Sequence, residues 1–99
     1  MLWEIVLEGP LIYPQWQGLP LVPTRAAMGE LARYGFSLAD VKDVLEEGYA
    51  CSGSKRKKGT FEKCLRSKSR VVKAVVVRSY NYSLATECWA LIHIGVLKT

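Results

Sequence analysis

The stretch "VVKAVVVRSY", residues 71–80, decides the fold because it is apolar on both of its alternating faces. Only Lys73 and Arg78 interrupt it with charge, and five of its residues are valine. Such a run is typical of a strand that is covered on both sides, and valine favours strands. The stretch therefore predicts the central strand of a sheet.

Strand patterns flank this stretch on both sides. "TFEKCLRS" (60–67) precedes it, and "ECWALIHIGV" (87–96) follows it after a turn at 81–86. The second segment alternates strictly, which predicts two distinct faces. One face is wholly apolar: Cys88, Ala90, Ile92, Ile94 and Val96. The other is mixed: Glu87, Trp89, Leu91 and His93. A short strand is expected at 49–51, followed by a basic turn at 52–59.

Two helices are predicted before these strands. In residues 24–35, Thr24 is the expected N-cap and Gly35 suits the C′ position. In residues 37–48, Ser37 caps the helix with Asp40 three residues on, and Gly48 ends it. Each segment carries one apolar stripe at helical spacing.

The N-terminal part is expected to contain a strand and a loop. Residues 2–8 are rich in strand-forming residues. Residues 9–23 hold all four prolines, so we expect no helix or central strand there. The aromatic and aliphatic side chains of this loop should anchor it on the core.

The sequence thus predicts an α+β domain with the order β-α-α-β-β-β-β, in which two helices pack on one face of a mainly antiparallel sheet. The 99 residues suffice for one domain, with a strand and loop at 1–23 and a core at 24–99.

The net charge of +5 is divided unevenly along the chain. Residues 1–54 hold three cations and seven anions, whereas residues 55–99 hold eleven cations and two anions. A one-sided positive field attracts anions, and phosphate backbones are the commonest large ones. We expect RNA or another polyanion to bind these basic residues: Lys55, Arg56, Lys57, Lys58, Lys63 and Arg66. The alternative is a basic surface that only keeps the protein in solution.

The cysteines Cys51, Cys64 and Cys88 are a sparse, odd set that predicts buried free thiols rather than a disulfide framework. Their spacing to His93 does not match structural zinc sites, so no metal and no cofactor is expected. No apolar run approaches the ~20 residues that cross a membrane. The N-terminus carries two glutamates and no early cation, unlike a signal peptide. These features predict a cytoplasmic protein without a membrane segment.

Three residues are candidates for catalysis. Metal-free RNA cleavage needs a group that takes the proton of the 2′-hydroxyl, a group that protonates the leaving oxygen, and cations for the phosphorane charge. Glu62, isolated in a cationic strip, and His93, the only histidine, suit the first two roles. Arg78 and Lys58 suit the third. If 87–96 pairs with 71–80, His93 and Arg78 are expected close together on one face.

Each candidate also has an ordinary structural interpretation. His93 is then a half-buried histidine, Glu62 relieves repulsion among neighbouring cations, and Arg78 pairs with Glu87 across two strands. Two aromatic residues of the last strands are expected to pack rather than to stack on bases: Tyr80 and Trp89.

Residues 32–48, "ARYGFSLADVKDVLEEG", followed by "KGTFEKC" (58–64), resemble a family of small domains allied to the BrnT and RelE toxins. The resemblance covers residues 24–96. It implies a RelE-like ribonuclease fold whose basic sheet face cleaves RNA and is covered by an antitoxin-like protein. Many relatives begin the first helix with a histidine, where this chain has Arg25 and Ala26.

Three functions remain open from the sequence. The first is a toxin-like, metal-independent endoribonuclease. The second is a non-catalytic nucleic-acid-binding module that uses the same basic residues. The third is a structural or partner-binding protein of a toxin–antitoxin-like pair, and a homodimer is compatible with each.

Overall fold

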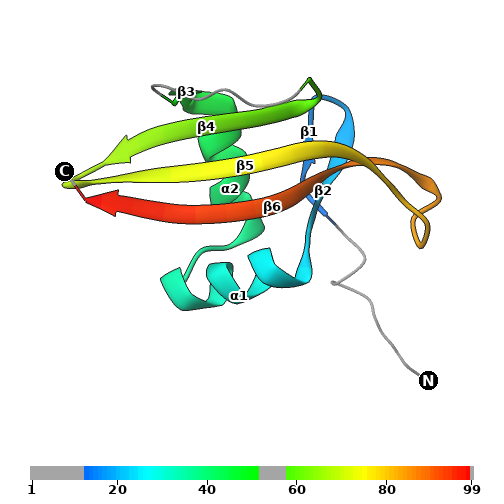
Figure 1. The fold of residues 1–99 in the computed structure, drawn as a ribbon, viewed down its shortest axis with the longest axis horizontal. Helices are drawn as coiled ribbons and strands as arrows, with labels where there is room; N and C mark the ends of the chain where they lie inside the picture. Colours follow the sequence, from blue (N-terminus) through cyan, green and yellow to red (C-terminus); the bar gives the residue numbers. More distant parts are fainter. Residues whose placement is uncertain (1–12, 52–57, 99) are drawn as a thin grey trace.

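A computed structural model describes residues 13–51 and 58–98 of the protein (Figure 1). Its elements are β1 (Gln15–Trp16), β2 (Leu19–Pro23), α1 (Arg25–Tyr34), α2 (Leu38–Glu47), β3 (Tyr49–Ala50), β4 (Thr60–Ser67), β5 (Arg70–Asn81) and β6 (Thr86–Lys98). The predicted α+β class is confirmed, whereas the predicted strand at 2–8 lies outside the described residues.

The sheet is mixed and has six strands in the order β1-β2-β6-β5-β4-β3. β2 runs parallel to β6, and the other neighbouring strands are antiparallel. β5 lies between β4 and β6, as expected of a strand that is apolar on both faces. Val75 and Val76 point to opposite faces, and both are buried. The central position of the valine-rich stretch is therefore confirmed.

The expectation of an irregular loop at 9–23 is wrong for its second half, which forms β1 and β2. The positive φ angles of Gln17 and Gly18 allow a two-residue turn between the two strands. Proline is tolerated in β2 because the strand is short and ends at Pro23. Pro23 has no N–H to donate to β6, but the next residue does: the Thr24 N–H donates to the Leu91 O at 2.9 Å. The expected aromatic anchor is present, since Trp16 is buried against Trp89 with ring centroids 4.9 Å apart.

Both helices begin and end where the sequence predicts. The Thr24 hydroxyl accepts the Ala27 N–H, and Gly35 ends α1 with a φ of 72°. Ser37 and Asp40 form the expected capping box of α2. The helices do not form one layer on one face, however: α2 lies behind β4 and β5, whereas α1 lies alongside β6 (Figure 1).

A β-bulge in β6 changes the expected faces of this strand. Val75 is opposite His93, but Val76 is opposite Leu91, so Ile92 is an extra residue with no partner on β5. Trp89 and Leu91 on one side of the bulge and Ile94 on the other all lie in the core. The strict alternation predicted for 87–96 is therefore wrong, because the bulge moves the apolar face from odd to even positions.

The core is formed by the helices and one sheet face. It contains Val41, Val44 and Leu45 of α2 and the even-numbered residues of β5: Val72, Ala74 and Val76. The other sheet face carries the odd-numbered residues of β5, together with Glu62 and His93. Within the described part of the chain, neither helix has the length and apolar character that a membrane crossing requires.

Candidate functional site

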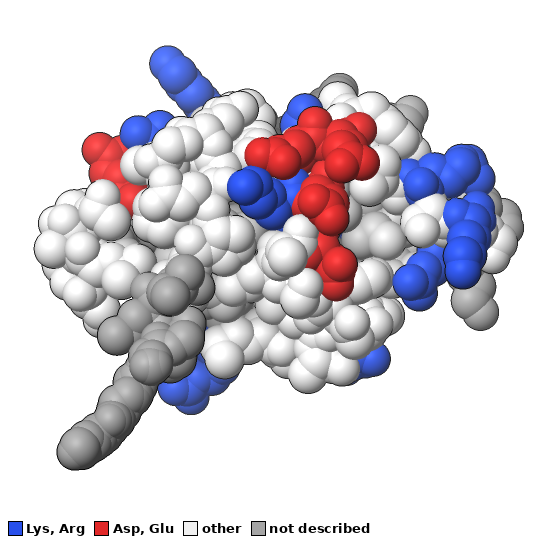
Figure 2. Space-filling model, turned by 180° about the vertical axis from the view of Figure 1, so that it is seen from behind, with Lys and Arg blue, Asp and Glu red and all other residues white. Residues whose placement is uncertain are grey.

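Charge is separated on the surface of the protein. Seen from behind, acidic side chains gather over α2 (Figure 2). The exposed acidic residues of this helix are Asp40, Asp43, Glu46 and Glu47. Basic side chains gather at one end of the same view. The exposed cations around the turn between β4 and β5 are Arg66, Lys68 and Arg70. A polyanion is therefore disfavoured over α2.

The predicted basic residues do not share one sheet face. Lys55, Arg56 and Lys57 lie outside the described residues. Lys58 is exposed in the turn before β4. Lys63 is opposite Ala74 and therefore points to the core side of the sheet, whereas Arg66 is opposite Val71 on the other side.

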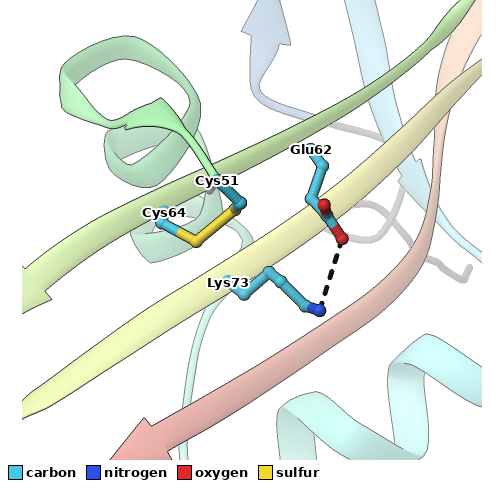
Figure 3. The surroundings of a disulfide bond; sticks show 4 residues. All are labelled: Cys51, Glu62, Cys64 and Lys73. Atoms are coloured by element: carbon cyan, nitrogen blue, oxygen red, sulfur yellow. Dashed lines mark ion pairs between the residues drawn. A yellow bond between two sulfur atoms is a disulfide. The ribbon is translucent and has the colours of Figure 1, made fainter. Parts of the chain in front are cut away.

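Glu62 pairs with a lysine of the central strand. The Lys73 Nζ lies 3.3 Å from the Glu62 Oε2, on the sheet face that carries the odd residues of β5 (Figure 3). The Glu62 side chain is only 6% exposed and that of Lys73 is 26% exposed. Glu62 is thus largely shielded from any substrate, while Lys73 remains within reach.

A disulfide joins Cys51 to Cys64 beside this ion pair (Figure 3). The expectation of free thiols at these two positions is wrong. The pairing of β3 with β4 brings the two Cα atoms within 5.4 Å, a proximity that no spacing in the sequence reveals. Cys88 is free and buried as predicted, and burial raises the pKa of its thiol. Its thiol therefore stays protonated and is a poor nucleophile.

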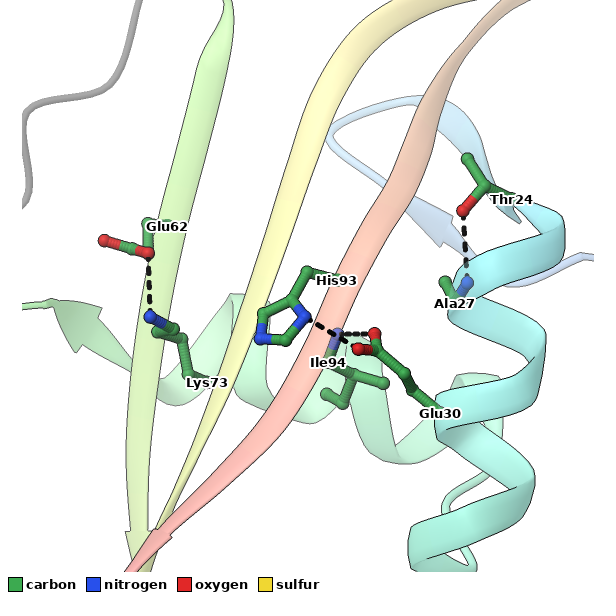
Figure 4. Close-up of polar contacts among 7 residues, drawn as sticks. All are labelled: Thr24, Ala27, Glu30, Glu62, Lys73, His93 and Ile94. Carbon is green, nitrogen blue, oxygen red and sulfur yellow. Dashed lines mark hydrogen bonds and ion pairs between the residues drawn. The ribbon is translucent and has the colours of Figure 1, made fainter.

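His93 forms a pair with a carboxylate of α1. Its Nδ1 lies 3.0 Å from the Glu30 Oε2, and the Glu30 Oε1 accepts the Ile94 N–H at 3.0 Å (Figure 4). One carboxylate therefore binds both the ring and the backbone of the adjacent residue. The His93 side chain is 42% exposed, more than those of Lys73 and Glu62 on the same face.

The local topology explains why Glu30 reaches this position. β2 pairs with β6 only as far as Leu91, which leaves the following edge of β6 without a strand partner. α1 begins two residues after β2 ends, and it lies alongside this open edge (Figure 1). Glu30 then satisfies a backbone N–H that would otherwise be left at the strand edge.

A glycine makes room for the His93 ring. Gly95 is opposite Lys73 in the sheet, and a Cβ at Gly95 would lie 2.9 Å from the His93 Nε2. The imidazole therefore lies over Gly95, and its free edge turns toward Lys73 (Figure 4). Lys73 and His93 therefore lie on the same sheet face, diagonally across the neighbouring strands β5 and β6.

Arg78 is not part of this group. It lies three residues along β5 from Val75, on the other face, so the expected proximity of Arg78 and His93 is not observed. Its guanidinium lies 2.7 Å from the Glu87 Oε1 and 5.6 Å from the centre of the Trp89 ring. The cross-strand pair with Glu87, which the sequence offered as the alternative, is confirmed.

Sequence reasoning missed two members of the site, Glu30 and Lys73. Lys73 had a visible signal, because it is the only charge within the buried part of the valine-rich stretch. Glu30 had no distinctive sequence signal, because it lies 63 residues from His93 and resembles any glutamate that flanks the apolar stripe of a helix.

No protein-family model, no curated protein and no solved structure matches this chain. In residues 13–51 and 58–98, no three His, Cys, Asp or Glu side chains form a group that could hold a metal ion. The candidate site therefore consists of Glu30, His93, Lys73 and Glu62.

Proposed function

We propose that this protein is a metal-independent endoribonuclease in which His93 transfers the proton. The observation that supports this proposal best is the Glu30–His93 pair, which leaves the Nε2 of a half-exposed ring on the sheet face that also carries Lys73. A histidine with one nitrogen bound to a carboxylate and the other open to solvent is a suitable general base.

The pair fixes the roles of the two ring nitrogens. Glu30 is acceptor-only as a carboxylate, so Nδ1 carries the hydrogen and donates it to the Oε2. Nε2 then holds the lone pair and can take the proton of an RNA 2′-hydroxyl. Glu30 acts as a positioning residue that holds the ring in this tautomer.

Lys73 is the residue placed to bind the reacting phosphate. Its ammonium stands on the same face as the Nε2 and can stabilise the charge that develops on the phosphoryl oxygens. The 2′-oxygen attacks the phosphorus, the bond to the 5′-oxygen breaks, and the leaving oxygen takes a proton from solvent. The products carry a 2′,3′-cyclic phosphate and a 5′-hydroxyl.

We assign Glu62 and Arg78 roles other than those expected from the sequence. Glu62 is too shielded to meet a substrate directly, so we assign it to holding Lys73 in place. Arg78 leaves β5 on the face opposite His93 and pairs with Glu87, so we assign it no part in the reaction.

Two further observations support an RNA substrate. The basic second half of the chain forms β4 and β5, whereas the acidic residues of α2 lie behind the sheet, away from His93. The resemblance of residues 24–96 to BrnT and RelE-type toxins adds support for a RelE-like fold and for an antitoxin-like partner.

The test is cleavage of labelled RNA in EDTA. Wild type should yield cyclic-phosphate ends, and His93→Ala should be slower by roughly 100-fold or more. Lys73→Gln should also be slower, whereas Lys42→Gln serves as the matched control, because Lys42 pairs with Glu46 on the far α2 surface. RNA with 2′-deoxy substitution at the cleaved position should stay intact.

Equal cleavage by wild type and His93→Ala would overturn the proposal, since it indicates a contaminating nuclease. RNA binding without cleavage would favour the second function, a non-catalytic nucleic-acid-binding module. Absence of both would favour a protein-binding role, which a pull-down with the wild-type chain would address.

A further inference from the structure

The hairpin formed by the ends of β5 and β6 extends beyond the rest of the sheet. β4 begins at Thr60, opposite Val77, so β5 has no partner in β4 beyond Val77. On the other side, β2 pairs with β6 only from Trp89 onward. Residues 79–88 therefore form a two-stranded ribbon that continues past the start of β4 (Figure 1).

Two tyrosines stand at the tip of this ribbon. The Tyr82 side chain is the most exposed large apolar group of the described residues at 88%, and Tyr80 is 47% exposed. Their ring centroids lie 5.0 Å apart at an interplanar angle of 64°. An aromatic ring in so exposed a position contributes little to the stability of the fold, because little of its apolar area is removed from water.

The tip is ordered by its own hydrogen bond. The Asn81 Oδ1 accepts the Leu84 N–H at 2.8 Å, which closes the turn that carries Tyr82. Ala85 completes the turn with a φ of 55°. The two rings are therefore presented on a defined turn, which lowers the entropic cost of binding a flat ligand on them.

A lysine lies at the root of the ribbon. The Arg78 N–H donates to the Gly59 O at 2.9 Å, so the turn that carries the exposed Lys58 packs against β5 two residues before Tyr80. Of these two described cations, Arg78 is held by Glu87, and Lys58 is the one suited to a phosphate.

We infer that the tip of the β5–β6 hairpin binds single-stranded RNA, with bases stacked on Tyr82 and Tyr80 and the backbone phosphate near Lys58. Exposed aromatic rings next to a cation are the means by which proteins bind unpaired strands, because only unpaired bases offer their faces. This inference rests on the proposed action on RNA and specifies that its substrate is unpaired.

The hairpin site is distinct from the Glu30–His93 pair. Tyr80 lies five residues along β5 from Val75, the partner of His93, about 17 Å at ~3.3 Å per residue, and its side chain leaves β5 on the other face. An RNA strand that reaches both sites must pass over the edge of the hairpin, so the hairpin holds a part of the RNA several nucleotides from the cleaved bond.

The experiment measures binding of a fluorescein-labelled 2′-O-methyl oligouridine, which cannot be cleaved through its 2′-oxygen, by fluorescence anisotropy. Tyr82→Ala should bind roughly 5- to 150-fold more weakly, the range expected for loss of one stacked base. Tyr82→Phe should bind like wild type, because it keeps the ring. Tyr49→Ala, which removes another exposed tyrosine on β3, should change nothing.

The same strand annealed to oligoadenine should bind more weakly and should not distinguish Tyr82→Ala from wild type. The unfolding midpoint of Tyr82→Ala should match that of wild type, since the ring is almost fully exposed. Equal binding of the single strand by Tyr82→Ala and wild type would overturn the inference. It would also be overturned if Tyr82→Ala weakened binding of the duplex as much as binding of the single strand.

The two proposals fail in different ways. Tyr82-dependent binding without cleavage of ordinary RNA would overturn the nuclease and leave the binding site in place. Cleavage by wild type with no effect of Tyr82→Ala on binding would overturn the hairpin site alone. Absence of any binding by wild type would overturn the hairpin site and point to a protein partner for the tyrosines.

Discussion

Glu30 serves two neighbours at once, and the two roles are separable by substitution. Its Oε1 accepts the Ile94 N–H, and its Oε2 accepts from the His93 Nδ1. A glutamine keeps one oxygen for the backbone but presents an NH₂ group to the ring, which favours the tautomer with hydrogen on Nε2.

We therefore expect Glu30→Gln to unfold at nearly the wild-type urea concentration yet to cleave RNA much more slowly. Glu30→Ala should lose activity and also about 1–2 kcal/mol of unfolding free energy, because the Ile94 N–H loses its acceptor. Full cleavage by the glutamine variant would show that the tautomer of His93 does not matter.

Local residue patterns predicted the parts of the structure that depend on near neighbours. Thr24, Ser37 and Gly35 act on groups within five residues of themselves, so their roles were readable. The contacts that were missed join distant positions. Glu30 meets His93 across 63 residues, and Cys51 meets Cys64 only because β3 pairs with β4. Spacing carries no information on such contacts without the register of the strands.

At the scale of elements, the junction of α2 with the sheet leaves less space around its glycine than any other glycine of residues 13–51 and 58–98 has. A Cβ on Gly48 would lie 2.6 Å from the Cys64 O and closer still to the Val44 O, both of them backbone atoms. Gly29, within α1, has nothing within 4 Å of the same position.

These two glycines provide a matched pair of substitutions. Gly29→Ala should raise the unfolding free energy by about 0.5–1 kcal/mol, since alanine favours a helix over glycine. Gly48→Ala should lower it by more than about 3 kcal/mol or prevent folding, because α2 and β4 must separate. Equal effects in urea unfolding would contradict the close packing of α2 on β4.

The disulfide is the second feature at this scale. It closes a loop between β3 and β4 with a sequence separation of 13, for which the chain-entropy estimate is about 3 kcal/mol. Reductant should lower the stability of wild type by about this amount and leave the Cys51→Ser/Cys64→Ser double variant unchanged.

A thiol titration in denaturant provides the direct check on this bond. One free thiol, that of Cys88, is expected without reductant, and three would show that the bond is absent. Disulfides persist mainly in oxidising compartments, so the redox conditions around the native protein decide whether this bond forms there.

At the scale of the whole molecule, the charge asymmetry predicts how RNA binding depends on salt. The logarithm of the binding constant should fall linearly with the logarithm of salt concentration, by about 0.7 for each phosphate contact with a single strand. Lys58→Gln and Lys73→Gln should each reduce the slope by about this amount.

Lys42→Gln provides the control for this measurement, because Lys42 stands among the acidic residues of α2 and should leave the slope unchanged. A slope near zero for wild type would show that phosphates are not the groups bound. Equal slopes for all three variants would show that RNA does not meet these particular lysines.

The bulge at Ile92 has a consequence for comparing this chain with others. It shifts the side-chain alternation of β6 by one place, so that Leu91 and Ile94 both face the core while His93 faces out. A chain with the same residues but no bulge would alternate regularly after Leu91, which would turn Ile92 outward and His93 to the core side of the sheet. The bulge itself, rather than the residue types of β6, therefore separates chains that display the imidazole from chains that bury it.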